Sequence, residues 1–337
     1  MINITQRGLV YIVVWIKKEK VNSTVTDFYL DTIGTAFEKL GKNVKYITKL
    51  DETPSFDHDV VVVSTATDAF RLFLKGKKYY FWSQGVWPEE SKMRHNSKIR
   101  FLICNTIERI ALKHAQYLFF VSDTMRSFYE KKYRLSFNNK CYIMPCSNDV
   151  MHKEAFVNKK YSNNVFCYVG GTSVWQCFEE TIELYSKIEQ VLVNSKLLLL
   201  VKDKKKAIDL INKYKVKNYE IDYVDLSELP SRLSEVKFGF VLRKNDPVNY
   251  VATPTKVLTY ISSGVIPIYS DSLAGIKTIL TTTKYKVEYH NDNNISNIIQ
   301  LATDTLNKEE ILKEYMGLYA TKYDRNKHIQ EIIEIFK

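Results

Sequence analysis

Residues 243–268 read RKNDPVNYVATPTKVLTYISSGVIPI, and this stretch decides the fold class. It follows a short apolar run at 238–242, and a second apolar run closes it; both are typical of β-strands. Between them Thr253 is expected to cap a helix, with Pro254 in its first turn and Gly264 at its end. The stretch therefore predicts a strand, a helix and a second strand, the repeating unit of an α/β fold.

Two basic side chains fall at the start of this unit. Arg243 lies at the end of the first strand, and Lys256 lies in the first turn of the helix. A helix start presents free N–H groups and the positive end of the helix dipole. Together with two cations, it predicts a site for a dianion such as a diphosphate. The alternative that this stretch leaves open is a well-capped helix flanked by two solvated cations.

The composition is that of a globular chain without a membrane span. Of the 337 residues, 45% are hydrophobic and 26% are charged, and the length suggests about two domains. No apolar run reaches the roughly 18 residues that a membrane helix needs, and the start of the chain lacks the pattern of a signal peptide. The five cysteines and six histidines show no metal-ligand spacing. We therefore expect a cytoplasmic protein with reduced cysteines, no cofactor and no metal.

A net charge of +11 favours an anionic partner. The candidates are a phosphorylated substrate, an acidic membrane surface and nucleic acid. The group Lys17, Lys18 and Lys20 predicts weak contact with an anionic membrane surface, on the inner face of the membrane. No nucleic-acid motif accompanies the basic residues, so no nucleic acid is expected as a partner. A basic surface that only keeps the chain in solution explains the charge equally well.

Strand and helix patterns alternate along the whole chain, which indicates parallel sheets. A polar, irregular stretch at 147–164 interrupts the alternation, and we place a domain boundary there. The first domain is predicted at 1–150 and the second at 165–320. Strands are expected at 8–16, 44–47, 59–64, 78–82, 117–122, 140–145, 165–169, 196–201, 219–224, 238–242 and 265–269. Helices are expected at 24–40, 66–74, 99–114, 123–133, 175–193, 207–214, 229–236 and 326–336.

Two further segments follow strands and carry polar or aromatic side chains. In YVGGTSVWQ (168–176), Gly170 and Gly171 allow the backbone to approach a phosphate, although a tight turn is the favoured explanation of a Gly-Gly that stands alone. In FWSQGVWPEES (81–91) we expect acceptor-binding residues, with tryptophan rings that stack on a sugar and polar groups that bind its hydroxyls. These residues are Gln84, Gly85, Trp87 and Glu89, with Trp82 as a second stacking candidate. The alternative for Glu89 is a plain helix start. Glu108 is expected to form an ordinary surface or interhelix pair.

Four segments carry a resemblance to a known family. VSDTMRSFYEKKY, CYIMPCSND, YVGGTSVWQ and GFVLRKNDPVNYVATPTKVLTYISSGVIPI follow one another as in GT-B glycosyltransferases. They look most like the bacterial family-four enzymes that build capsular or other surface polysaccharides. The resemblance implies an α/β fold with two Rossmann-like domains facing a central cleft. It implies an N-terminal domain for the acceptor, a C-terminal domain for the sugar nucleotide, and a helix at 321–337 that crosses back to the first domain.

The same resemblance implies a retaining reaction without metal, in which Arg243 and Lys256 are catalytic and neutralise the leaving diphosphate. The implied donor-binding residues are Gly170, Gly171, Thr172, Arg243, Asn249, Tyr250, Val251, Thr253, Pro254, Thr255, Lys256 and Thr259. The chain departs from the family at Thr259, where a glutamate usually binds the ribose hydroxyls. It departs again at Val251, where a partner glutamate is common.

We therefore expect a glycosyltransferase that moves a hexose from a nucleoside-diphosphate sugar to a glycan or lipid-linked glycan acceptor. UDP is the favoured nucleotide. Two alternatives remain open. The missing glutamates favour a non-catalytic sugar-nucleotide-binding partner of another glycosyltransferase, and the charge favours a basic nucleic-acid-binding α/β protein.

Overall fold

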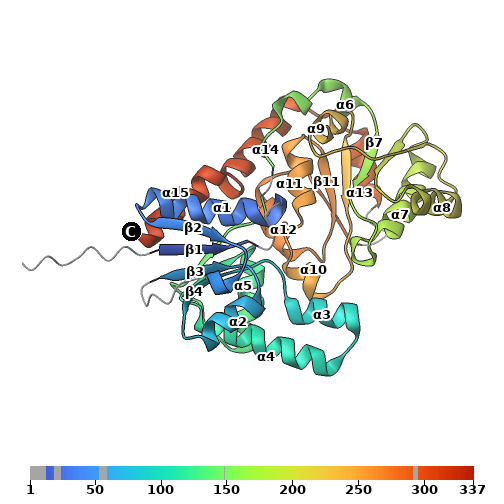
Figure 1. The fold of residues 1–337 in the computed structure, drawn as a ribbon. Coiled ribbons are helices and arrows are strands. Elements are labelled where there is room, and N and C mark those ends of the chain that lie inside the picture. The colour runs from blue at the N-terminus through green and yellow to red at the C-terminus, as the bar shows by residue number, and fades with distance from the viewer. Residues whose placement is uncertain (1–12, 19–23, 53–58, 148, 291–294) are drawn as a thin grey trace, which may run out of the picture. The chain divides into compact units, whose positions relative to one another are not determined.

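The chain folds into two compact units (Figure 1). Unit 1 comprises Met1–Pro145 and Asp324–Lys337, and unit 2 comprises Cys146–Tyr323. This computed structural model describes residues 13–18, 24–52, 59–147, 149–290 and 295–337. The first five residues of the strand expected at 8–16, and Lys20, lie outside the described residues.

Unit 1 is built on a parallel sheet of six strands, in the order β2-β1-β3-β4-β5-β6. Its strands are β1 Val13–Lys17, β2 Asn43–Ile47, β3 Val60–Val63, β4 Lys78–Ser83, β5 Tyr117–Phe120 and β6 Cys141–Ile143. Every residue of β3 and β5 is buried, because helices cover both faces of a parallel sheet. This explains why both strands read as continuous apolar runs rather than as an alternating pattern.

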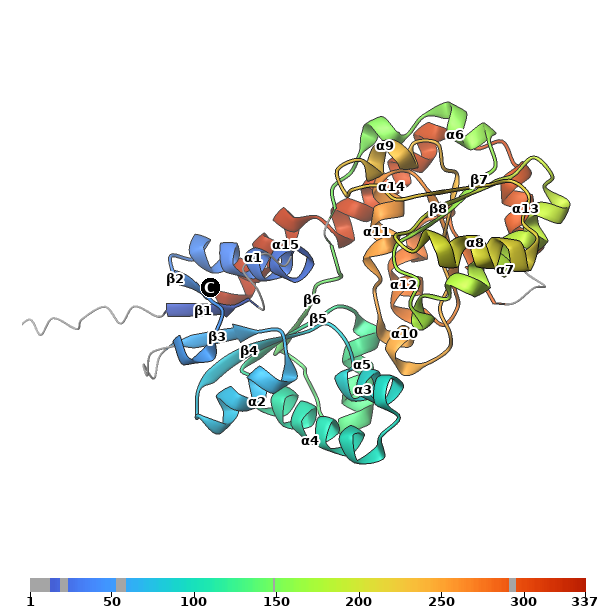
Figure 2. The same cartoon turned by 45° about the vertical axis from the view of Figure 1, so that its right-hand side comes forward.

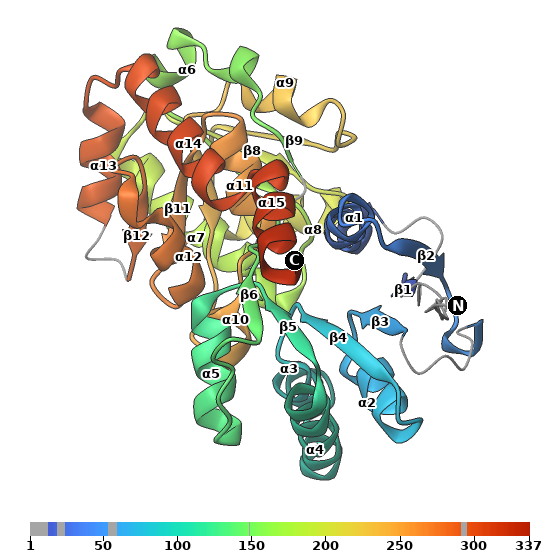
Figure 3. The ribbon, with the colours of Figure 1, turned by 90° about the vertical axis from the view of Figure 1, so that its left-hand side faces the viewer.

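The helices of unit 1 are α1 Thr24–Lys39, α2 Ala66–Leu74, α3 Trp87–His95, α4 Lys98–His114, α5 Asp123–Tyr133 and α15 Arg325–Phe336. Helices α2 and α4 lie on one face of the sheet and α1 and α15 on the other (Figures 2 and 3). The ring of Phe336 packs against Phe37, Tyr80 and Tyr117, with centroid distances of 4.8–5.1 Å. The guanidinium of Arg325 also donates to the Thr32 hydroxyl on α1 (3.2 Å). An aromatic cluster and a polar contact therefore hold α15 to unit 1.

Unit 2 contains a second parallel sheet, in the order β12-β11-β10-β7-β8-β9. Its strands are β7 Val165–Val169, β8 Lys196–Leu200, β9 Tyr219–Asp222, β10 Phe238–Val241, β11 Ile266–Ser270 and β12 Val287–Tyr289. The chain leaves β7 toward β8 and leaves β10 toward β11, in opposite directions. The carboxyl ends of these two neighbouring strands therefore form a topological switch point, the place where open α/β sheets bind ligands.

Helices cover both faces of this sheet as well. They are α6 Asn158–Ser162, α7 Phe178–Val191, α8 Lys204–Tyr214, α9 Leu229–Leu233, α10 Pro247–Val251, α11 Thr255–Ser262, α12 Ala274–Ile279, α13 Ile295–Thr303 and α14 Lys308–Lys322. Figure 1 shows α11, α12 and α14 on one face and α7, α8 and α13 on the other. None of the described helices is both long and apolar enough to cross a membrane.

One local prediction around α11 is wrong. Thr253 does not cap the helix, because α11 begins at Thr255 and its N-cap residue is Pro254. The Thr253 hydroxyl instead accepts the Cys146 N–H (3.3 Å). The loop expected before it contains the short helix α10, whose cap is the Asp246 carboxylate.

The basic group near the start of the chain is largely neutralised within unit 1. The ammonium group of Lys17 pairs with Asp68 at 2.7 Å, and that of Lys18 pairs with Asp31 at 2.9 Å. Since two of the three lysines already have carboxylate partners, the group offers a membrane surface less charge than the sequence suggests.

Two glycines provide a matched test of the unit 2 core. A Cβ at Gly239 in β10 would lie 2.5 Å from the ring of Tyr260, whereas a Cβ at Gly317 in α14 meets nothing within 4 Å. Gly239→Ala should therefore lower the free energy of unfolding by about 1–3 kcal/mol through overpacking. Gly317→Ala should raise it by about 0.5–1 kcal/mol, because alanine favours the helix. Urea unfolding measures both changes, and equal effects of the two would contradict this packing.

Candidate functional site

The loop after β7 brings a glycine against a lysine. Gly170 has φ +118°, a backbone conformation that residues with side chains rarely adopt, and its N–H bonds the Leu200 carbonyl (3.0 Å). A Cβ at Gly170 would also lie only 3.4 Å from Cε of Lys256. The glycine thus lets the β7 loop pass close to the first turn of α11.

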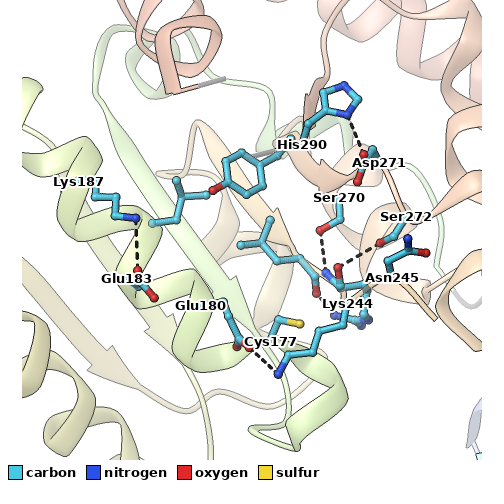
Figure 4. Close-up of a pocket in the computed structure, with 14 residues that line it drawn as sticks. Cys177, Glu180, Glu183, Lys187, Lys244, Asn245, Ser270, Asp271, Ser272 and His290 are labelled. Carbon is cyan, nitrogen blue, oxygen red and sulfur yellow. Dashed lines mark hydrogen bonds and ion pairs between the residues drawn. The ribbon is translucent and has the colours of Figure 1, made fainter. Parts of the chain in front are cut away.

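Arg243 lies two residues after the end of β10, and residues at the end of β11 and in the loop after it hold its backbone. The Arg243 N–H donates to Oγ of Ser270 (2.8 Å), and the Ser272 hydroxyl donates to the Arg243 carbonyl (3.1 Å). Figure 4 shows these two serines side by side at the carboxyl end of β11. Because both serines are buried, the strand end is fixed and the guanidinium projects from a rigid base.

Gln176 joins Arg243 to Lys256. Its side-chain oxygen accepts from Nη2 of Arg243 (2.8 Å) and from Nζ of Lys256 (3.1 Å). Its backbone carbonyl accepts a further bond from Nη1 of Arg243 (3.3 Å). Gln176 ends a short 3-10 helix, Val174–Gln176, in the segment between Gly170 and α7. Three parts of unit 2 that are distant in sequence therefore meet at one neutral oxygen.

The two cations carry an excess of positive charge. Among the described residues, no carboxylate forms an ion pair with Arg243 or Lys256. The nearest compensation for Lys256 is the ring of Tyr168, whose centroid lies 4.0 Å from Nζ. Burial, and then the charge of Arg243, holds the pKa of Lys256 well below its ordinary value. Burial also lowers the pKa of Arg243. A bound anion would relieve both effects, so the arrangement suits an anionic ligand.

The remaining donor-binding candidates differ in how far they are exposed and in whether their polar groups are already bonded. Gly171 is exposed, while Thr172, Pro254, Thr255 and Thr259 are half-buried near the same strand ends. The exposed side chain of Tyr250 is 46% accessible. By contrast, Val251 is fully buried, and the amide of buried Asn249 is already bonded to the Lys244 carbonyl and the Asp246 carboxylate. The side chains of Asn249 and Val251 therefore shape the loop from within.

A cavity of 560 Å³ opens beside Arg243 in unit 2. Its walls come from α7 and from the carboxyl ends of β10, β11 and β12 (Figure 4). Paired polar side chains rim it. Lys244 forms an ion pair with Glu180 at 2.9 Å and Lys187 with Glu183 at 3.3 Å, and His290 is hydrogen-bonded to Asp271 at 2.8 Å. Of the expected donor residues only Arg243 lines it, so this cavity extends the candidate site in a direction that the sequence did not indicate.

Unit 1 has a cavity of its own, of 460 Å³, at the carboxyl ends of β3 and β4. Three of the four acceptor candidates line it: Gln84, Gly85 and Trp87. The fourth, Glu89, instead pairs with Lys132 at 2.8 Å. Hydroxyl groups complete the lining, from Ser64, Thr65, Thr67 and Ser83. Hydroxyls, an amide and an indole ring suit a ligand with many hydroxyl groups.

One expectation for unit 1 is wrong, and another is met only in part. Trp82 cannot stack on a ligand, because it is fully buried and packs on Tyr29 with ring centroids 4.5 Å apart. Glu108 does form an interhelix pair, with Lys132 of α5 at 3.4 Å, but it is not at the surface: its side chain is 1% exposed and lines the unit 1 cavity. Its carboxylate accepts from the Trp87 N–H (3.0 Å) and the Tyr133 hydroxyl (2.7 Å).

The comparisons with known proteins concern the fold. No model of a protein family and no curated protein sequence matches the chain. Several solved structures match the chain in their fold. Sucrose-phosphate synthase from Thermosynechococcus elongatus is 11% identical with a TM-score of 0.70, and the match covers 96% of this chain and 98% of that one. The fold is GT-B.

Two further structures agree. Anabaena HepE in complex with UDP and glucose is 11% identical with a TM-score of 0.65, over 96% of this chain and 98% of that one. WaaG, a glycosyltransferase involved in lipopolysaccharide biosynthesis, is 14% identical with a TM-score of 0.60. That match covers 96% of this chain and 99% of the WaaG chain. The expected α/β class with two Rossmann-like domains is thereby confirmed.

Sequence reasoning missed Gln176 and the burial of Glu108. Gln176 belongs to the quoted YVGGTSVWQ segment, and its position after a Gly-Gly loop was the available signal. Glu108 gave no signal, because a glutamate beside Arg109 in a long helix is an ordinary surface pattern. The packing of α3 and α5 against α4 buries it.

The buried carboxyl of Glu108 should make stability depend on pH. Burial raises its pKa from 4.5 to about 7, although Lys132 and the Tyr133 hydroxyl oppose the shift. The folded state then binds the proton more tightly than the unfolded state, so this contribution is present below pH 4.5 and is lost as pH rises through 7. Glu108→Gln should therefore remove a decrease of about 3 kcal/mol in the free energy of unfolding, which the wild type shows as the pH rises.

Urea unfolding of the wild type and of Glu108→Gln at pH 5, 6, 7 and 8 measures this difference. Glu228→Gln, which removes an exposed carboxylate, is the control and should leave the pH profile unchanged. Parallel profiles for the wild type and Glu108→Gln would contradict the buried, protonatable state.

Proposed function

We propose that the chain is a glycosyltransferase that moves a hexose from a nucleoside-diphosphate sugar, with UDP as the favoured nucleotide, to a glycan or lipid-linked glycan. The observation that carries the proposal is the pair Arg243 and Lys256, joined through one neutral oxygen at the switch point of unit 2. Two desolvated cations beside a glycine loop and a helix start suit a diphosphate. HepE, which shares the fold, is solved with UDP and glucose.

In this proposal Arg243 and Lys256 act on the leaving group. As the bond between the sugar and the diphosphate breaks, negative charge grows on the diphosphate oxygens. Preorganised cations stabilise that charge more in the transition state than in the ground state, which accelerates the reaction. The bonds from Ser270 and Ser272 to the Arg243 backbone keep one cation in position without further reorganisation.

The cavity of unit 1 is the proposed acceptor site. Gln84 and the hydroxyls of its walls offer hydrogen bonds to sugar hydroxyls, and Trp87 offers an aromatic face. The carboxyl of Glu90 also lines it, and burial raises its pKa. Surface polysaccharide biosynthesis in a bacterium and a retaining reaction belong to the same proposal and rest on the sequence resemblance alone. A cytoplasmic location belongs to it as well and rests on the composition of the chain. Contact with an anionic membrane rests on the net charge of +11 rather than on the paired Lys17 and Lys18.

One observation favours a second candidate, a sugar-nucleotide-binding protein without transferase activity. Thr259 stands where the resembled family has the glutamate for ribose hydroxyls, and its hydroxyl already contacts the Thr255 carbonyl (3.4 Å). Such a protein would bind UDP sugars without turnover. Release of UDP from UDP sugars in the presence of glycan acceptors separates the two candidates.

Arg243→Ala and Lys256→Ala should each lower the rate of sugar transfer by about a hundredfold or more, because each removes one charge that stabilises the leaving diphosphate. Binding of UDP, measured by calorimetry, should weaken in both variants. Lys205→Ala is the matched control, since it removes one exposed lysine charge of the same unit. Thermal unfolding verifies that each variant is folded. Near-normal transfer and UDP binding in both variants would remove the proposed roles.

Activity should not depend on a divalent metal, since the two cations supply the positive charge at the leaving group. Among the described residues, no group of three or more His, Cys, Asp or Glu could hold a metal ion. Transfer assayed after dialysis against EDTA should equal transfer before it. A loss that manganese or magnesium restores would show a metal-dependent donor site.

A further inference from the structure

The side chain of Gln176 lies where a ligand oxygen is expected. Its Oε1 is 2.8 Å from Nη2 of Arg243 and 3.1 Å from Nζ of Lys256. The guanidinium of Arg243 can only donate, so the amide must turn its oxygen, not its NH2 group, toward it. One neutral oxygen therefore accepts from two cations, and this is the contact that a phosphate oxygen would make at the same place.

In the free protein this contact offsets the repulsion between the two side chains, as a bound anion would. Without an acceptor, two neighbouring cations would repel each other in a poorly solvated pocket. The amide oxygen satisfies one donor of each and holds them together. It carries only a partial negative charge, however, and hydrogen bonds to a charged oxygen are about twice as strong as those to a neutral one. A phosphate oxygen would therefore displace the Gln176 oxygen as the acceptor of both donors.

The covalent position of Gln176 permits this exchange. The side chain is half-buried and carries three rotatable bonds, so that a rotamer change alone frees the donors. Its backbone need not move, because the bond from Nη1 of Arg243 to the Gln176 carbonyl involves a different nitrogen (3.3 Å). Lys206 anchors the same loop further upstream through the Thr172 carbonyl (2.7 Å).

We infer that Gln176 is a displaceable substitute for a donor phosphate oxygen. It positions Arg243 and Lys256 while the site is empty and leaves both when a diphosphate binds. The identity of that diphosphate as part of a sugar nucleotide rests on the proposed function; the exchange itself requires only an anion. Gln176 is thus a positioning residue that also sets how much affinity the site has for anions.

Two substitutions give opposite results. Gln176→Glu places a full negative charge between the two cations, and a ligand must then displace this carboxylate from an ion pair. The affinity of the variant for inorganic pyrophosphate should fall by about tenfold or more, while the Tm of the variant rises. Gln176→Met keeps the volume but has no oxygen to displace. Its pyrophosphate affinity should stay within about threefold of wild type or increase, while its Tm falls slightly.

The experiment is calorimetric titration of the full chain with inorganic pyrophosphate, together with thermal unfolding of each variant. Gln300→Glu, which adds the same charge at an exposed position of α13, is the control for net charge and should match the wild type. A loss of affinity with a gain of Tm in Gln176→Glu, and retained affinity in Gln176→Met, support the inference. A loss of affinity in Gln176→Met as large as in Arg243→Ala overturns it, because Gln176 would then contact the ligand directly. Unchanged affinity in Gln176→Glu overturns it as well.

The result is separable from that of the proposed function. A wild-type protein that binds pyrophosphate but shows neither binding nor turnover of UDP sugars contradicts the proposed function and leaves the behaviour of Gln176 to be judged from the variants. If Gln176→Glu does not fold, the affinity of Gln176→Met for pyrophosphate tests the inference by itself. A wild type that binds no pyrophosphate at all overturns both.

Discussion

The site of unit 2 depends on keeping two like charges close together where water is scarce. Arg243 and Lys256 lack a carboxylate partner among the described residues, so weaker acceptors must offset their repulsion. Gln176 gives one oxygen to both, the Leu242 carbonyl accepts from Arg243 (2.7 Å), and Tyr168 presents its ring to Lys256. Each of these is a neutral group. These contacts offset the repulsion between the two side chains, and in the proposed function a bound diphosphate would offset it further.

The strand order explains how such a site is assembled from distant residues. Because β7 and β10 are neighbours and their connections leave in opposite directions, the loops that carry Gly170 and Arg243 start at the same edge of the sheet. The helix α11 then returns beside them and presents Lys256 from its first turn. The small residue Gly239 lets the ring of Tyr260 pack against β10, which sets how closely α11 approaches the sheet. A local change in β10 would therefore reach the site through α11.

Patterns along the chain predict most of the fold, because strand and helix periods report directly which faces are buried. They place β7 at its observed bounds, and the ends of most other elements within a few residues. They fail where tertiary packing decides. Glu108 is buried only when α3 and α5 pack against α4, and Thr253 bonds to Cys146 rather than to its own helix. In the site, Arg243 and Lys256 follow from strand and helix ends. Gln176 does not, because its role exists only when three separate segments meet.

The placement of α15 in unit 1 has a consequence for synthesis of the protein. Unit 2 is inserted between β6 and α15, so a ribosome makes all of Cys146–Tyr323 before the helix that completes unit 1. During that interval Phe37, Tyr80 and Tyr117 of the nascent first unit lack the ring of Phe336, which packs on them in the complete protein. Domains usually finish folding in the order of their synthesis. Here the later unit can close first, and the earlier one waits, with an aromatic surface that a chaperone can bind.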